Sequence, residues 1–294
     1  MELQGGRVLA FGTAGAQGSG VVPAAAGRGV QVVRATTRPE RAAAWRDAGE
    51  QAAVADLTDP DSVVAAARDV DAVVLHLPVS AGRPDDREGV VRSVAELRRA
   101  GRPVAVNVGA PVPPAGAPDV FGTGEIAARL RDTGAAVLTP TAYLENHAAP
   151  WAVGPVRAGE LLYPRPAADR LAWIAAGDLG AAALAALAAG VEGELVALAG
   201  PQVLSFDELA AELSAGLGRA VAFRRVTPAE YGDLLRPVLG PEAAAGVEAA
   251  YSAMPEASPE GMRIDATDAW KRLGVTPTTA RDWAATVLAA AVAR

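Results

Sequence analysis

The stretch "FGTAGAQGSG" at residues 11–20 decides the fold, because Gly12, Gly15 and Gly18 recur in it at intervals of three. It follows an apolar run and precedes a segment of helical character, which is the context in which a glycine-rich turn binds a dinucleotide. Gly12 would allow the tight turn, Gly15 the approach of a pyrophosphate to the backbone, and Gly18 close packing of the first helix on the sheet. That helix is expected to begin near Gln17 and to offer its amides to the pyrophosphate. A glycine-rich hairpin without a ligand is the alternative.

Apolar runs alternate with alanine-rich helical segments through the first 140 residues. This alternation is typical of parallel strands joined by crossover helices. Strands are predicted over residues 7–11, 30–35, 52–55, 71–77, 103–108 and 135–139. Helices are predicted over residues 18–26, 38–48, 59–68, 86–100 and 122–132. The sequence therefore predicts an α/β protein with a Rossmann-type, doubly wound parallel sheet.

The alternation breaks up after about residue 150, where loops rich in proline begin. The expected division places residues 1–149 in the dinucleotide-binding domain, with residues 171–191 returning to it. Residues 150–170 and 192–294 would form a smaller, partly discontinuous α/β lobe. Such a lobe would cover the ligand edge of the sheet and meet the substrate or a partner.

Composition narrows the possible partners. The 294 residues carry a net charge of −7 with scattered basic residues, which argues against nucleic acid or an anionic membrane surface as partner. No cysteine is present and no metal site is expected. No stretch has the length of about 20 apolar residues that a membrane span needs. We expect a cytoplasmic protein, monomeric or homodimeric, with a small-molecule partner; its alanine and arginine content is typical of GC-rich bacteria.

The end of the second predicted strand indicates which dinucleotide binds. An NAD site carries a carboxylate there, whereas an NADP site uses arginine to pair with the 2′-phosphate. The stretch "RATTR" at residues 34–38 has no acid and ends on Arg38, with Thr37 beside it. NADP(H) is therefore favoured over NAD(H). Asp56, after the third strand, could accept from the adenine amino group or could simply cap the entry to a helix.

Polar residues lie near the carboxyl ends of two further strands. His76 ends "DAVVLH" and Asn107 ends "VAVN". Ligands of doubly wound sheets bind beyond this edge, so both residues are candidates for the cofactor site. Alternatively, His76 caps a backbone carbonyl and Asn107 holds a turn.

Four stretches together resemble the NmrA-like branch of the atypical short-chain dehydrogenases. They are "VLAFGTAGAQGSGVV", "VVRATTRPERAAAW", "TPTAYLENHAAPW" and "LAGPQVLSFDELAAELSAGLGRAVAFRRVTPAEY". Members of that family include NADPH-dependent quinone reductases and proteins that bind NADP without known turnover and act as redox-sensing regulators. The resemblance runs from end to end of the chain and implies an NADP-binding Rossmann domain.

The resemblance also implies which residues meet each part of the cofactor. The glycine-rich turn would contact the pyrophosphate, Arg38 the 2′-phosphate, and the segments after strands three, four and six the adenine, ribose and nicotinamide. The expected cofactor-binding residues are Gly12, Thr13, Ala14, Gly15, Ala16, Gln17, Gly18, Thr37, Arg38, Asp56, Leu57, His76, Leu77, Pro78, Asn107, Thr123, Tyr143, Leu144, Glu145 and Asn146.

The acid–base chemistry of most short-chain dehydrogenases is missing from this sequence. Those enzymes use a Tyr-x-x-x-Lys pair, in which lysine lowers the pKa of the tyrosine. The only lysine here is Lys271, far from any such position, and Thr123 or Gly124 stands where lysine-bearing reductases of the family have theirs. Tyr143, His76 and His147 are the candidate proton donors, in that order; Tyr143 and His76 are the expected catalytic residues.

Two functions agree with this residue set. One is NADPH-dependent hydride transfer to a quinone-like or conjugated carbonyl or imine molecule, which needs little acid catalysis because positioning supplies much of the barrier reduction. The other is a non-catalytic NADP(H)-sensing protein of regulatory type. Tyr143, Trp151, Tyr163 and Trp173 would suit a flat, conjugated acceptor, or would instead pack the two lobes together.

Overall fold

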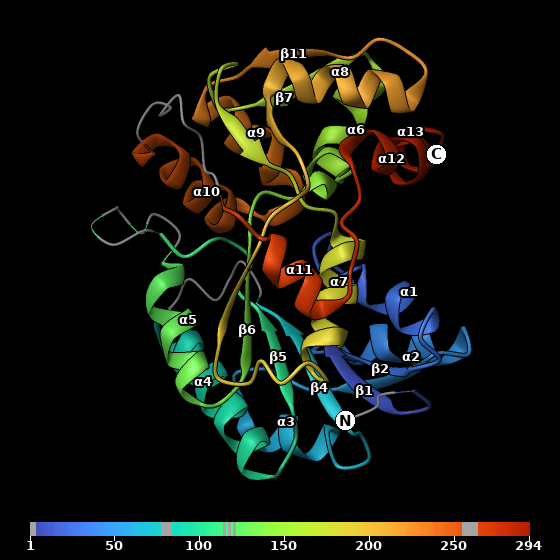
Figure 1. Ribbon diagram of the computed structural model, residues 1–294, viewed down its shortest axis with the longest axis vertical. Coiled ribbons are helices and arrows are strands. Elements are labelled where there is room, and N and C mark those ends of the chain that lie inside the picture. Colours follow the sequence, from blue (N-terminus) through green and yellow to red (C-terminus); the bar gives the residue numbers. More distant parts are fainter. Residues whose placement is uncertain (1–3, 78–83, 114–115, 117–118, 120–121, 255–263) are drawn as a thin grey trace. The chain divides into compact units, whose positions relative to one another are not determined.

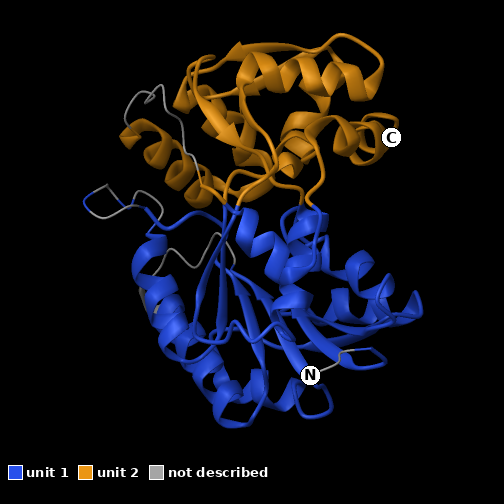
Figure 2. Ribbon diagram, viewed as in Figure 1, with its two compact units in different colours: residues 1–140, 176–198, 266–276 blue, residues 141–175, 199–265, 277–294 orange. Residues whose placement is uncertain are grey.

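The computed structural model describes residues 4–77, 84–113, 116, 119, 122–254 and 264–294. Among these residues no helix is long and apolar enough to cross a membrane. The chain divides into two compact units, coloured separately in Figure 2. Unit 1 comprises residues 1–140, 176–198 and 266–276, and unit 2 comprises residues 141–175, 199–265 and 277–294.

Unit 1 is built on a seven-stranded parallel sheet in the order β3-β2-β1-β4-β5-β6-β9. Its strands are β1 (Arg7–Phe11), β2 (Gln31–Thr36), β3 (Gln51–Val54), β4 (Ala72–His76), β5 (Val104–Asn107), β6 (Ala136–Pro140) and β9 (Leu195–Leu198). The strand order reverses between β1 and β4, so the carboxyl ends of these two strands flank the point where doubly wound sheets bind ligands. The predicted Rossmann-type sheet is confirmed.

Helices cover both faces of this sheet, as Figure 1 shows: α3, α4 and α5 lie along one face, and α1, α2 and α7 along the other. The bounds of these helices are α1 (Val21–Ala26), α2 (Pro39–Asp47), α3 (Pro60–Ala66), α4 (Pro84–Arg99), α5 (Thr123–Asp132) and α7 (Ala176–Ala186). Unit 1 also contains α11 (Thr267–Leu273). The central strands β5 and β6 are buried throughout because both of their faces are covered. The edge strand β3 has no fully buried residue.

Helix α1 begins at Val21, and not near Gln17 as the sequence predicted. Residues 13–20 form turns, and glycines at 15, 18 and 20 disfavour helix in this stretch. Gly20 serves the contact between α1 and α7: a Cβ there would lie 1.9 Å from the carbonyl oxygen of Ala176. A Cβ on Gly180 would in turn lie 2.3 Å from the backbone of Gly20. This glycine contact fixes the end of the glycine-rich turn against α7.

Unit 2 contains two small sheets and a helical layer around an aromatic core. Strand β11 pairs parallel to β7, and β10 pairs antiparallel to β8. The elements are η2 (Leu144–His147), α6 (Pro150–Arg157), β7 (Glu160–Tyr163), β8 (Arg170–Ala172), β10 (Val203–Ser205), α8 (Phe206–Leu217), β11 (Ala222–Arg225), α9 (Pro228–Leu239), α10 (Pro241–Ala253), α12 (Ala280–Trp283), η3 (Ala284–Leu288) and α13 (Ala289–Val292). Capping boxes begin α8 at Ser205 and α9 at Thr227.

The observed units differ from the expected domains in four segments. Residues 141–149 and 171–175 belong to unit 2, because Tyr143 bridges to Ile174 within that unit. Residues 192–198 belong to unit 1, because β9 pairs with β6 as the seventh strand. Residues 266–276 also return to unit 1, where α11 packs on α7 and β9. Pairings between segments so far apart in sequence leave no local signal.

Candidate functional site

The glycine-rich turn leaves β1 with a backbone that only glycine adopts readily. Gly12 has a φ of +78°, and its carbonyl accepts a hydrogen bond from the amide of Gly15 at 3.0 Å. A Cβ on Gly18 would lie 2.3 Å from the carbonyl oxygen of Gly12. Gly18 is therefore required for closing the turn on itself, whereas the sequence had predicted close packing of the helix on the sheet.

Gly15 differs from its two neighbours in the motif. A Cβ there would meet nothing nearer than the carbonyl oxygen of Gly12, at 3.5 Å, which is ordinary van der Waals contact. The protein itself therefore does not require glycine at this position. A dinucleotide bound at the turn would require it, because a side chain would fill the space through which the pyrophosphate is expected to approach the backbone. The turn fits the cofactor that the sequence predicted.

His76 and Asn107 lie beside this turn, at the carboxyl ends of the neighbouring strands β4 and β5. The two are register partners, and their side chains are hydrogen-bonded to each other. Asn107 also accepts from the amide of Gly109 through Oδ1 at 2.9 Å, so it does hold a turn. A Cβ on Gly12 would lie 3.0 Å from the Cβ of His76, which packs the imidazole directly against the turn.

Burial lowers the pKa of His76 to about 4, and the hydrogen bond with Asn107 opposes this shift. The imidazole is therefore neutral at pH 7. A neutral imidazole is a poor general acid, so His76 is better suited to contacting a cofactor ribose than to donating a proton. Leu77 continues beyond β4 and is buried, and Pro78 lies outside the described residues.

Arg38 lies two residues beyond the end of β2, immediately before α2, and is exposed. Its amide donates to Oγ1 of Thr36 at 3.2 Å, and its guanidinium has no hydrogen bond or ion pair among the residues that the structure describes. Thr37, next to it, is exposed as well. An arginine at the end of β2 whose charge is uncommitted is available to a phosphate.

Asp56, beyond β3, is partly committed to local structure. Its Oδ1 accepts from the amide and from the hydroxyl of Thr58, each at 2.8 Å. This is the cap-like role that the sequence left open, and Oδ2 accepts no hydrogen bond from the described part of the chain. Leu57 is buried beneath this turn. The adenine contacts of both residues stay predictions.

Thr123, which with Gly124 is one of the two residues expected in place of the family's lysine, lies at the start of α5. Its hydroxyl donates to the carbonyl of Pro111 at 2.8 Å, and its amide donates to the Asp119 carboxylate at 2.8 Å. The same carboxylate accepts from the amide of Gly124 at 2.7 Å. Thr123 therefore fastens the segment before α5, and its contact with the cofactor stays a prediction.

The residues expected at the nicotinamide end all belong to unit 2. Tyr143 and Leu144 are buried, and Asn146 is half-buried with a side-chain hydrogen bond to Tyr163. Oε1 of Glu145 accepts from the indole of Trp283 at 2.8 Å inside the unit. Glu145 thus ties η2 to α12, a structural role that the sequence pattern did not reveal.

His147 lies within the aromatic core of unit 2. Its ring centroid is 4.8 Å from that of Trp173 and 5.9 Å from that of Tyr163. Burial lowers its pKa to about 3. Tyr163 and Trp173 also contact Phe206 in this core. These aromatic side chains are therefore interior residues of unit 2, which favours packing over the presentation of a flat surface to an acceptor.

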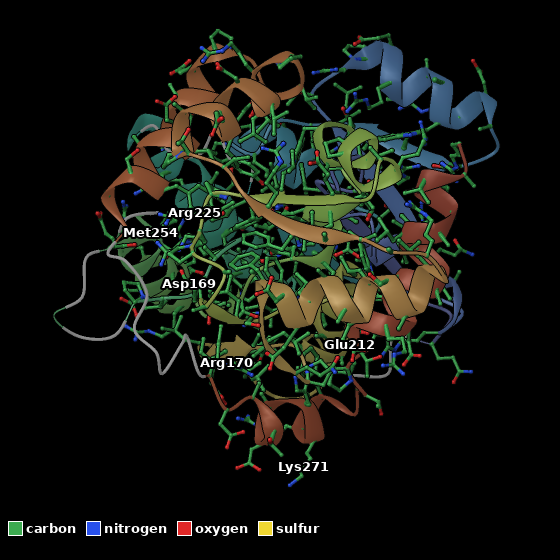
Figure 3. The ribbon with its side chains drawn as sticks, turned by 90° about the horizontal axis from the view of Figure 1, so that it is seen from above. Asp169, Arg170, Glu212, Arg225, Met254 and Lys271 are labelled. Carbon is green, nitrogen blue, oxygen red and sulfur yellow. The ribbon has the colours of Figure 1, made fainter. Side chains whose placement is uncertain are left out.

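Lys271, the single lysine, lies on α11 and projects outward from the ribbon in Figure 3. Its side chain is 74% exposed and lies 3.7 Å from the Asp268 carboxylate. The single lysine of the chain is therefore a surface residue of unit 1. Within the described ranges, no group of three or more histidine, aspartate or glutamate residues is arranged to hold a metal ion.

Comparison with known proteins supports a nucleotide-binding domain. Residues 12–153 match the family model described as NAD(P)H-binding. No curated protein matches the sequence. The matched segment contains the glycine-rich turn, Arg38 and the strands β2 to β6. This match confirms NAD(P)H as the cofactor class predicted from the turn.

Solved structures resemble nearly the whole chain. An NADPH-dependent quinone oxidoreductase from Escherichia coli is 22% identical, with a TM-score of 0.64 over 96% of this chain and 99% of that one. The triphenylmethane reductase of Citrobacter sp., complexed with NADP(H), is 20% identical, with a TM-score of 0.67 over 96% and 99%. The UDP-N-acetylglucosamine 4-epimerase of Bacillus cereus is 12% identical, with a TM-score of 0.65 over 98% and 99%. At these identities the likeness shows the fold.

Proposed function

We propose that this chain, whose residues 12–153 match the NAD(P)H-binding family model, is an NADPH-dependent oxidoreductase of NmrA-like type. It would transfer hydride to a quinone-like or conjugated carbonyl or imine small molecule. The observation that carries the proposal is the pairing of a dinucleotide turn with an uncommitted arginine, Arg38, at the end of β2. The NADP(H) complexes of the quinone oxidoreductase and the triphenylmethane reductase support the same cofactor.

NADPH, when bound, supplies the hydride. The chain's own residues would hold it in place: the amides of the turn at the pyrophosphate, Arg38 at the 2′-phosphate, and His76 with Asn107 at the ribose. Each of these groups lies at or just beyond the carboxyl end of a strand in unit 1, on the sheet edge that contains the reversal of strand order between β1 and β4. Orientation of the nicotinamide by such contacts can supply a large part of the barrier reduction.

The protonation states favour an acceptor that needs little acid catalysis. His76 and His147 are both neutral at pH 7, since burial holds their pKa values near 4 and 3. Lys271 is in solvent. Tyr143 is then the remaining proton donor of the predicted set. A quinone or an extended conjugated system can accept hydride and take its proton from water, so this residue set suits it better than a simple ketone.

A non-catalytic, NADP(H)-sensing protein is the second candidate. The observation that favours it concerns Thr123, one of the two residues expected in place of the family's lysine. Its hydroxyl donates to a backbone carbonyl and its amide to the Asp119 carboxylate. A protein with a complete cofactor turn and few acid–base groups can bind NADPH without turnover. The predicted cytoplasmic location and monomeric or homodimeric state remain part of either proposal.

The two candidates separate in one assay. Purified protein is mixed with NADPH and, in turn, a benzoquinone, a naphthoquinone and a triphenylmethane dye, and loss of the reduced nicotinamide absorbance is followed. The oxidoreductase proposal expects consumption of NADPH well above the protein-free rate with at least one acceptor, and slower consumption of NADH. Tight NADPH binding without consumption for any acceptor would refute it and support the sensing role.

A further inference from the structure

Arg34 makes three contacts that link the start of β3, the helix α2 and the glycine-rich turn. Its Nε donates to Oγ1 of Thr13 at 3.1 Å, and its Nη1 forms an ion pair with Glu50. Its Cζ lies 3.9 Å from the ring centroid of Trp45. The side chain is only 15% exposed, so these contacts hold the guanidinium in one place. The sequence alone does not predict this network, because Arg34 and its three partners lie far apart along the chain.

The position of Arg34 sets it apart from Arg38. Arg34 lies in β2, opposite Ala10 of β1, and its side chain is committed to protein groups. Thr13 follows Gly12 and is itself buried, with 4% of its surface exposed. Arg34 therefore reaches the turn through the side chain of Thr13, whereas Arg38 is exposed and, within the described residues, available to a ligand.

We propose that Arg34 is a positioning residue of the cofactor site: the Glu50–Arg34–Thr13 chain fixes the glycine-rich turn and thereby sets the affinity for the dinucleotide. The hydrogen bond from a charged donor fixes the rotamer of Thr13. It also leaves the threonine hydroxyl hydrogen free to donate, and a hydroxyl that accepts a charged hydrogen bond is itself a better donor.

This role predicts equal effects on two cofactors. The turn faces the pyrophosphate, which NADPH and NADH share, whereas the 2′-phosphate belongs to NADPH alone. Loss of Arg34 should therefore weaken both cofactors in the same proportion, unlike loss of Arg38. The inference rests on the NAD(P)H-binding domain of the proposed function, and it does not depend on hydride transfer.

The test is a double-mutant cycle on Arg34 and Thr13, with dissociation constants for NADPH and NADH measured by nucleotide fluorescence. Arg34→Gln and Thr13→Val should each weaken both cofactors about tenfold, the loss expected for a charge-assisted hydrogen bond. The double variant should also lose about tenfold and not a hundredfold, because both changes remove the same bond. Thr13→Ser, which keeps the hydroxyl, should restore the affinity that Thr13→Val loses.

Arg46→Gln is the matched control. Arg46 also fastens α2 to β3, through hydrogen bonds of 3.2 and 2.8 Å from Nε and Nη2 to the carbonyl of Ala52, but these bonds do not involve the turn. Its replacement should lower the melting temperature and leave both dissociation constants unchanged. If Arg34→Gln does not fold, the cycle is run with Glu50→Gln and Thr13→Val, whose effects should again not multiply.

Several results would overturn the inference. They are multiplicative losses in the cycle, a loss confined to NADPH, unchanged affinity in Arg34→Gln, or an equal loss in Arg46→Gln. A wild-type protein that binds neither cofactor would overturn the proposed function as well. Binding that follows the predicted cycle, without reduction of any acceptor, would uphold this inference and refute only the oxidoreductase.

Discussion

Replacement of His147 by glutamine should flatten the acid dependence of stability. The imidazole is 1% exposed, and its Nε2 has no hydrogen-bond partner among the described residues. It packs against the rings of Trp173 and Tyr163. Protonation would create a buried charge with an unsatisfied donor, so burial lowers the pKa to about 3.

The sign follows from proton linkage. The unfolded chain binds a proton at His147 near the ordinary pKa of 6.5, while the folded protein does so only near 3. The contribution of His147 to the unfolding free energy is therefore fully present above about pH 6.5. It is lost progressively as the pH falls from there toward 3. At pH 5, about 1.5 pH units below the unfolded value, the loss from this one residue is about 2 kcal/mol.

The assay is urea unfolding at pH 7.5 and pH 5, followed by tryptophan fluorescence. Between these two pH values, His147→Gln should lose about 2 kcal/mol less of its unfolding free energy than the wild type loses. The matched control is Phe206→Leu, which disturbs the same aromatic core without removing a titrating group. It should lower stability equally at both pH values. Identical pH dependence in the wild type and His147→Gln would refute the reasoning.

Three further predictions concern the cofactor turn and the core of unit 2. Arg38→Ala should weaken NADPH binding by about tenfold or more and leave NADH binding nearly unchanged, because only the 2′-phosphate pairs with it; titration of both cofactors tests this, and equal losses would contradict it. Gly15→Ala should abolish cofactor binding at an unchanged melting temperature. Gly18→Ala should lower the melting temperature, because a Cβ on Gly18 would lie 2.3 Å from the backbone whereas one on Gly15 would not clash. Equal melting temperatures of the two variants would contradict the assigned roles. Trp283→Phe should cost about 1–3 kcal/mol of unfolding free energy, because it removes the hydrogen-bond donor to buried Glu145. Glu145→Gln keeps an acceptor for the Trp283 indole, so an equally large cost in that variant would contradict the assigned hydrogen bond.

The predictions that held depend on short stretches of chain. The first strand is predicted and observed at Arg7–Phe11, and the turn after it has the positive φ that the glycine at position 12 implied. Apolar runs and glycine spacing report burial and backbone conformation, which are local properties. For this reason the doubly wound sheet and its nucleotide-binding edge are predictable from the amino-acid sequence.

The roles of polar side chains were harder to predict. Glu145 stands in a motif that resembles a nicotinamide-binding element, yet its Oε1 accepts from Trp283, 138 positions further along the chain. Thr123 is engaged with Pro111 and Asp119. A residue type shows which bonds a side chain can make, but the partner that folding places beside it decides which of them it does make.

The sequence by itself therefore determined the fold class, the place of the dinucleotide turn and the absence of a Tyr-Lys pair. Only the tertiary structure decided that β9 and α11 return to unit 1, that both histidines are neutral, and that Arg34 holds the turn through Thr13. The physical reason is one of range. Turn geometry and strand patterning depend on neighbours in the chain, whereas burial, proton affinity and ion pairing depend on groups that meet only after the chain has folded.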